Sequence, residues 1–114
     1  MSTITSHVLD TERGRPAAAV PVRLEMQSAD QSWKTLAKAL TDSDGRVKDL
    51  LPMDAQLALG TYRIIFDTAA YFFSQNTPGF YPEVAVVFVV RNPGERYHIP
   101  LLLSPYGYST YRGS

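Results

Sequence analysis

The two histidines of this chain are its best candidates for proton transfer. His7 and His98 are the only histidines among the 114 residues. An imidazole has an ordinary pKa of about 6.5, so it can take a proton from water or return one near neutral pH. Taken singly, a histidine is more often a structural or surface group, and that alternative stays open for both. If Tyr97 and Ile99 face a core, the alternation of the sequence turns His98 the other way, into a pocket or a subunit interface.

An arginine follows a sequence with turn chemistry. Arg46 comes directly after Asp42-Ser43-Asp44-Gly45, in which glycine can take a positive φ. A guanidinium is a planar fork that binds carboxylate, urea-like or enolate oxygens. A solvated cation at a loop tip is the simpler interpretation, because loop tips are normally polar.

The last residues form a compact set of donors and acceptors. They are Tyr111, Arg112, Gly113 and Ser114. Chain ends usually fray, so we interpret this ending as a docking point for a ligand or another subunit. Simpler readings are a packing or interface anchor for the tyrosine and a local ion pair for the arginine, worth about 0–1 kcal/mol.

Composition excludes several classes of protein. There is no cysteine, which rules out disulfides, thiolate zinc sites and a cysteine nucleophile. Eleven basic and eleven acidic residues cancel, so no net field attracts nucleic acid or an anionic membrane. Two histidines without a clustered carboxylate are a weak metal signal, and no phosphate-binding glycine loop is present.

The chain is expected to be one cytoplasmic domain covering residues 1–114. Its first residues lack a basic region followed by an apolar run, so we expect no signal peptide in this form. The longest apolar stretch, residues 84–90, is too short to span a bilayer.

Period-two alternation of apolar and polar residues predicts a mostly β protein. One short helix is expected over residues 69–75, capped by Asp67 or Thr68. The run 83–90 is the most apolar and is expected in the middle of a sheet, and the last strand is expected to reach the C-terminus. Seven or eight short strands at near-regular spacing indicate a β-sandwich. The expected strands cover residues 4–9, 20–26, 33–40, 62–66, 83–90, 97–103 and the C-terminal run.

Several motifs resemble those of the transthyretin-related 5-hydroxyisourate hydrolases. The resemblance covers essentially the whole chain, and its most specific part is the terminal tetrapeptide together with His7, Arg46 and His98 in order. Transthyretin, the hormone carrier of this fold, lacks that ending and those histidines. The matching segments are Ser6-His7-Val8-Leu9-Asp10, Gly14-Arg15-Pro16-Ala17, Asp44-Gly45-Arg46, Phe80-Tyr81-Pro82-Glu83-Val84, residues 97–105 and Tyr111-Arg112-Gly113-Ser114.

The resemblance implies a fold, an assembly and a reaction. The fold would be a transthyretin-like sandwich of two four-stranded sheets with one short helix. The protein would be a homotetramer with its active sites where dimers meet. It would hydrolyse 5-hydroxyisourate to 2-oxo-4-hydroxy-4-carboxy-5-ureidoimidazoline in urate breakdown, without a cofactor.

The resemblance also implies which residues form the site. His7, Arg46, His98 and Ser114 would line it as catalytic residues. Substrate would contact His7 and Arg46, together with Tyr111 and Arg112. Two departures from the family are visible: Arg96 stands where a histidine is common, and Tyr81 where a phenylalanine is common.

Two alternatives from other classes stay open. The first is a transthyretin-like carrier that binds a small aromatic ligand without chemistry, because a fold does not fix a function. The second is a regulatory or adhesion sandwich of the kind found in carboxypeptidase-type proteins. Such domains normally lie inside larger secreted chains, which this one does not resemble.

Overall fold

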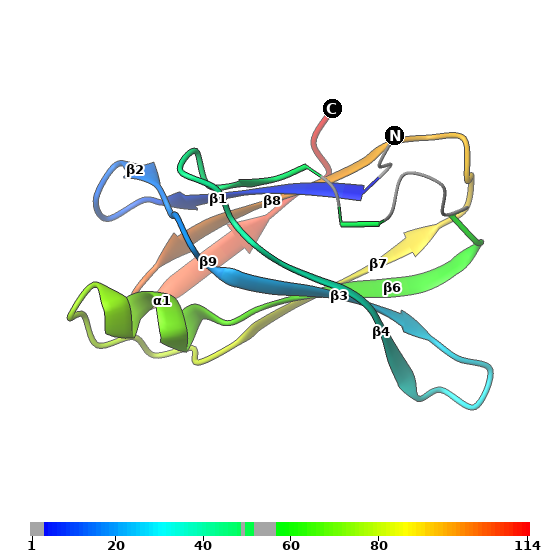
Figure 1. Cartoon of the computed structure of the whole chain (residues 1–114), viewed down its shortest axis with the longest axis horizontal. Coiled ribbons are helices and arrows are strands. Elements are labelled where there is room, and N and C mark those ends of the chain that lie inside the picture. The colour runs from blue at the N-terminus through cyan, green and yellow to red at the C-terminus, as the bar shows by residue number, and fades with distance from the viewer. Residues whose placement is uncertain (1–3, 49, 52–56) are drawn as a thin grey trace.

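The computed structural model describes residues 4–48, 50–51 and 57–114. Within these residues, nine strands and one helix form two stacked sheets with the helix at one end (Figure 1). This confirms the predicted mostly β sandwich. No helix among the described residues is long and apolar enough to cross a membrane.

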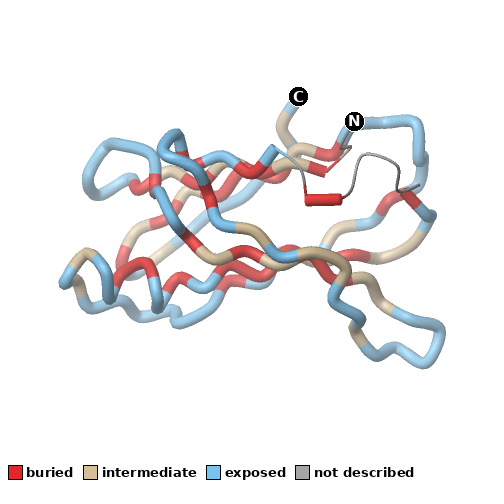
Figure 2. Tube along the Cα trace, in the orientation of Figure 1, coloured by how far each residue is buried: buried red, intermediate tan, exposed pale blue. Residues whose placement is uncertain are grey.

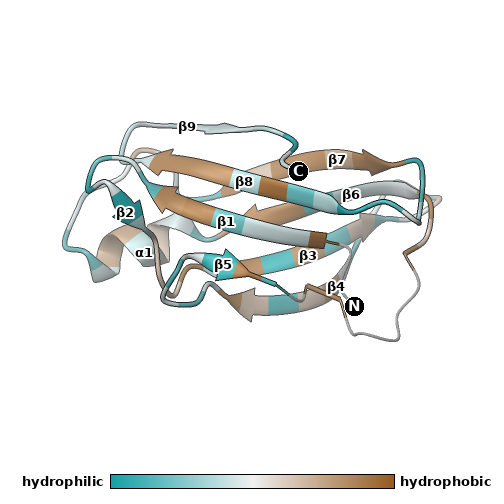
Figure 3. Ribbon diagram, turned by 90° about the horizontal axis from the view of Figure 1, so that it is seen from above, coloured by the Kyte–Doolittle hydropathy of each residue, from teal (hydrophilic) through white to brown (hydrophobic). Residues whose placement is uncertain are grey.

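The first sheet joins the two ends of the chain. Strand β1 (Ile4–Asp10) pairs in parallel with β8 (Tyr97–Ser104), which pairs antiparallel with β9 (Gly107–Thr110). Two strands of two residues each, β2 (Arg15–Pro16) and β5 (Arg46–Val47), pair with β1. Seen from above, this sheet presents β5, β1, β8 and β9 side by side, with the C-terminus beside β8 (Figure 3).

The second sheet is antiparallel throughout. Its order is β4 (Trp33–Leu40), β3 (Pro21–Gln27), β6 (Gly60–Phe66) and β7 (Val84–Val90). Pro21 is the first residue of β3, which suits a residue without an N–H.

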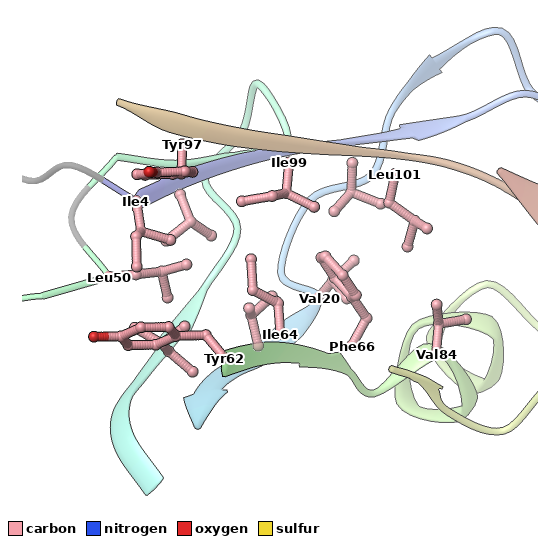
Figure 4. Close-up of a cluster of buried hydrophobic side chains, with 14 of the residues drawn as sticks. Ile4, Val20, Leu50, Tyr62, Ile64, Phe66, Val84, Tyr97, Ile99 and Leu101 are labelled. Carbon is pink, nitrogen blue, oxygen red and sulfur yellow. The ribbon is translucent and has the colours of Figure 1, made fainter. Parts of the chain in front are cut away.

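The core lies between the sheets and follows from the alternation of each strand. In β1 buried and partly buried residues alternate without exception, so one face packs inward and the other turns away. Buried residues form a continuous layer between the two sheets (Figure 2). The close-up shows side chains of the first sheet facing those of the second, among them Ile4, Ile99, Leu101, Ile64 and Phe66 (Figure 4).

The helix is tied to the first sheet by a buried polar contact. Helix α1 (Thr68–Ser74) begins after Asp67, whose side chain accepts a hydrogen bond from the N–H of Ala70, as predicted for a cap. The hydroxyl of Tyr71 donates to Oδ2 of Asp10 at 2.6 Å. This contact joins α1 to the end of β1.

Two expectations were wrong. Strand β7 is an edge strand within this chain, and Val87 and Val89 are 57% and 42% exposed. An apolar run marks a strand, but the run does not say which neighbours the strand has. The last strand ends at Thr110, and the chain beyond it regains only an isolated bridge between Gly113 and His98.

Candidate active site

The parallel pairing of β1 and β8 brings the two histidines to one face of the first sheet. His98 pairs with Thr5, and His7 lies two residues further along β1. Paired residues project to the same side of a sheet, as do residues i and i+2 of one strand. Both histidines are partly buried, whereas the neighbours of His98 in β8, Tyr97 and Ile99, are buried on the core side. The outward orientation predicted for His98 is therefore confirmed.

Arg46 joins the same face through β5. It pairs with His7 across the antiparallel ladder between β1 and β5, and it is exposed. The preceding glycine allows this approach: Gly45 has a φ of 75°, and a Cβ there would collide with the carbonyl oxygen of Val8.

A single carboxylate organises the turn before Arg46. The Oδ1 atom of Asp42 accepts hydrogen bonds from the N–H groups of Asp44 and Arg46, both at 2.9 Å. These backbone hydrogen bonds, that of Arg46 first, hold the pKa of Asp42 below its ordinary value, with smaller help from the charge of Lys48. The predicted turn is therefore present, and the side chain of Asp42 stabilises it through these two hydrogen bonds.

The same turn fixes the tautomer of His7. Its Nε2 atom lies 2.9 Å from the backbone oxygen of Asp44. A carbonyl oxygen only accepts hydrogen bonds, so Nε2 carries the proton. In the neutral ring, Nδ1 of His7 is then the atom with a lone pair.

His98 is held by Thr5 and kept neutral by its surroundings. Its Nδ1 atom lies 2.8 Å from the hydroxyl of Thr5. Partial burial lowers the pKa of His98 below its ordinary value, and the charges of Arg46 and His7 lower it further. The imidazole of His98 is therefore mostly neutral at pH 7.

The C-terminal segment returns to His98 from the side opposite β1. The N–H of Gly113 donates to the carbonyl oxygen of His98 at 2.8 Å. A Cβ at residue 113 would lie 2.5 Å from Cδ2 of the imidazole, so only glycine fits without a shift of the ring. Ser114 follows directly and is exposed.

Two of the expected site residues lie elsewhere in this chain. Tyr111 and Arg112 line a groove of about 320 Å³ along β7. The guanidinium of Arg112 stacks 4.7 Å from the centre of the Tyr97 ring and pairs with Glu95 at 3.3 Å. The Nη2 atom of Arg112 also donates to the carbonyl oxygen of Arg96. Arg96 itself is an exposed residue. The structure thus brings together His7, Arg46 and His98, and places Tyr111 and Arg112 beside the edge of the other sheet.

A second pocket lacks the groups suited to proton transfer near neutral pH. It measures about 440 Å³ and lies on the second sheet, between Arg23, Lys38, Leu40 and Ile65. Neither histidine lines this pocket. We therefore place the candidate site on the first sheet, although the pocket on the second sheet is larger than the groove along β7. Among the described residues, no group of three or more His, Cys, Asp or Glu side chains is arranged to hold a metal ion.

Two residues of the site were not assigned to it from the sequence, although Asp42 was named as part of a turn. Thr5 and Asp42 touch or position the expected residues, yet each resembles an ordinary strand or turn residue. The alternation of β1 could have placed Thr5 on the face of His7. Only the pairing with β8 shows that Thr5 reaches His98.

The fold and the site together define a transthyretin-like sandwich that carries two imidazoles and a guanidinium on one face. The chain belongs to the HIUase/Transthyretin family, which its residues 4–113 match. A 5-hydroxyisourate hydrolase of Salmonella typhimurium is 50% identical over 111 residues, 97% of this chain and 80% of that protein. The 5-hydroxyisourate hydrolase of Mus musculus is 43% identical over 114 residues, 99% of this chain and 96% of the mouse protein.

Solved structures agree with the fold and include a 5-hydroxyisourate hydrolase and a transthyretin. The 5-hydroxyisourate hydrolase of Klebsiella pneumoniae has a TM-score of 0.86 and 33% identity, with both chains fully covered. Sea bream transthyretin in complex with thyroxine has a TM-score of 0.91 and 33% identity, covering 97% of this chain and 94% of that one. The backbone alone therefore does not separate an enzyme from a carrier.

Proposed function

We propose that this protein is a 5-hydroxyisourate hydrolase of urate degradation. The observation that carries the proposal is the convergence of His7, Arg46 and His98 on one sheet face, from the three separate strands β1, β5 and β8. Relatives of that name that are 43–50% identical over nearly the whole chain support it. The product would be 2-oxo-4-hydroxy-4-carboxy-5-ureidoimidazoline.

In the proposed reaction water opens the six-membered ring. The water oxygen bonds to the ring carbonyl carbon, the carbon–nitrogen bond breaks, and the nitrogen leaves with a proton as part of a ureido group. His98 is the base that takes a proton from water, because its lowered pKa keeps it neutral. His98, once protonated, returns this proton to the leaving nitrogen. The Nε2–H of His7 is engaged by the carbonyl oxygen of Asp44, so Nδ1 of His7 accepts a hydrogen bond from the substrate or the water.

Arg46 is the electrostatic partner of this pair. Its guanidinium would bind the oxygens of the substrate and stabilise the negative charge that develops on the attacked carbonyl. Loss of such a donor typically costs about 10²–10³ in turnover. The side chain is exposed and free to reach a substrate, while its backbone is held by Asp42.

Completion of the site by other subunits forms part of the proposal. Within one chain the face with His7 and His98 is open, and open sites bind small polar molecules poorly. A homotetramer would cover this face where dimers meet, and Tyr111 or Arg112 of a neighbouring subunit could then contact substrate. Ser114, through its hydroxyl or α-carboxylate, would orient a histidine or the water.

The carrier is the second candidate, supported by the backbone similarity to transthyretin. A carrier needs an apolar channel rather than a pair of proton-transfer groups. The deciding measurement is the ultraviolet decay of 5-hydroxyisourate, generated in situ by urate oxidase, with and without the protein. We expect acceleration that is lost in Arg46→Ala and in His98→Asn, with the tetramer preserved.

A matched control separates loss of chemistry from loss of charge. Lys38 is an exposed cation on the second sheet, so Lys38→Ala removes one positive charge away from the site and should leave the decay unchanged. Decay at the spontaneous rate in the presence of folded wild-type tetramer would refute the hydrolase and favour the carrier.

A further inference from the structure

We infer that Thr5 is a positioning residue that accepts a hydrogen bond from Nδ1–H of His98 and thereby leaves the lone pair of Nε2 to act as the base. This inference rests on the proposed hydrolase function and names the atom of His98 that carries it. The resemblance between this chain and its family does not identify this residue, because a threonine in a strand has no catalytic signature of its own.

The contact between Thr5 and His98 has the geometry of a full hydrogen bond. The Oγ1–Nδ1 distance is 2.8 Å and the contact is partly buried, so water competes with it only weakly. Thr5 is β-branched and lies in the middle of a sheet between β5 and β8, which restricts its χ1 angle. The hydroxyl is therefore held in place rather than free to rotate into solvent.

The other side of the imidazole is also held. The N–H of Gly113 donates to the carbonyl oxygen of His98, and a Cβ at residue 113 would collide with the ring at Cδ2. Thr5 thus holds Nδ1 from β1, while Gly113 limits the ring from the C-terminal segment. Within the described part of the chain, Nε2 of His98 has no hydrogen-bond partner, so this atom remains available to a substrate or water.

The direction of the hydrogen bond follows from charge. A threonine hydroxyl can donate or accept, so distance alone allows two tautomers of His98. Arg46 is permanently positive and lies on the same sheet face as His98, because it pairs with His7, two residues along β1 from the partner of His98. A positive neighbour favours a lone pair over an N–H on the nitrogen that faces the site. The proton therefore resides on Nδ1, and Thr5 accepts it.

The tautomer can be read directly in the protein without substrate. In wild-type protein labelled with ¹⁵N-histidine, at a pH where the ring is neutral, long-range ¹H–¹⁵N correlation spectra should show His98 protonated at Nδ1 and unprotonated at Nε2. His98→Asn assigns the signals. In Thr5→Val, which keeps the shape but removes the hydroxyl, the signals should shift toward the other tautomer.

Kinetics supply the second readout. Thr5→Val should lower kcat about tenfold with little change in KM, since loss of one hydrogen bond misorients the base and does not remove a substrate contact. Thr5→Ser should restore most of the rate because it restores the hydroxyl. Thr61→Val, on the other sheet, is the matched control and should behave as wild type.

The two proposals fail in different ways. A wild-type His98 protonated at Nε2, or a Thr5→Val variant with unchanged tautomer and kcat, would overturn the role of Thr5. Loss of rate in Thr5→Ser as large as in Thr5→Val would also overturn it, because shape rather than the hydroxyl would then matter. A wild-type protein without hydrolase activity would instead refute the proposed function, while the spectra would still report the hydrogen bond.

Discussion

The carboxylate of Asp42 and the backbone N–H of Arg46 form a 2.9 Å hydrogen bond that presents the guanidinium to the site. The same turn offers the carbonyl oxygen of Asp44 to His7. One exposed acid therefore holds the turn that contacts two of the three groups in the site.

Asp42→Ala should lower hydrolase activity with little change in thermal unfolding. The turn would lose its two side-chain hydrogen bonds, so Arg46 would be held less firmly, and such misplacement can cost about 10²-fold in rate. The 5-hydroxyisourate decay assay and a thermal scan measure both effects. Asp30→Ala is the matched control, because Asp30 caps a comparable turn between β3 and β4, away from the site. Equal activity in the two variants would contradict this role of Asp42.

The pH dependence of activity should follow His98. Its pKa lies below the ordinary value, chiefly through burial and then through Arg46, so the acid limb of kcat/KM should fall below about pH 6.5. In Arg46→Ala the positive neighbour is gone, and the pKa of His98 measured by NMR titration should rise. The unfolded chain binds this proton more tightly than the folded one, so stability should decline as the pH falls below the ordinary value. An unchanged pKa in Arg46→Ala would show that the two side chains are not coupled.

Gly113→Ala should damage the site by pushing on the imidazole. The new Cβ would lie 2.5 Å from Cδ2 of His98, so either the ring or the C-terminal segment must move. We expect a loss of turnover of about 10²-fold with the oligomer intact. Gly107→Ala provides the comparison, since a Cβ there meets only Oγ of Ser104 at 3.7 Å. Normal turnover in Gly113→Ala would mean that the ring position is not critical.

Ser114 gives a prediction about the chain end. Removal of this residue, or extension of the chain beyond it, should strongly reduce turnover while the fold is retained, because the proposed role needs its hydroxyl or α-carboxylate near His98. Circular dichroism and the decay assay on tagged and untagged protein measure the two properties. A fully active protein with a C-terminal tag would eliminate Ser114 from the mechanism.

Tyr71→Phe should destabilise the fold without a direct effect on chemistry. Burial and the carboxylate of Asp10 raise the pKa of Tyr71 to about 12, so the phenol always donates to that carboxylate. Removing the donor leaves a buried acceptor short of one partner and should cost about 1–3 kcal/mol in urea unfolding. Tyr62→Phe should cost less, because its partner is a neutral carbonyl oxygen. Equal costs would argue against the importance of the buried charge.

Local patterns in the sequence predicted much of the fold, and pairing between distant strands supplied the rest. The alternation around His98 predicted its outward orientation, and the residues before Arg46 predicted a turn. Neither pattern contains information on which strands become neighbours. For this reason β7 was expected in mid-sheet, although it lies at an edge within this chain.

In the candidate site, too, some residues could be found from the sequence and others only from the strand pairing. Residue type singled out His7 and His98, because few other side chains transfer protons near neutral pH. The role of Thr5 depends on a register between segments 93 residues apart, and one sequence contains no trace of that register. The positions of Tyr111 and Arg112 likewise depend on where the chain goes after β9 ends at Thr110.

The parallel pairing of β1 with β8 has a consequence for biosynthesis. A ribosome makes β1 first, and β2 and β5 follow early, but β8 emerges only some ninety residues after β1, so the edge of β1 that pairs with β8 must wait without its partner. Contacts between such distant segments form slowly because a long loop must close first. During that interval the apolar side of β1 is open to wrong partners, which is the situation that chaperones relieve. The face that carries His7 and His98, which needs both strands, is accordingly among the last parts of the molecule to form.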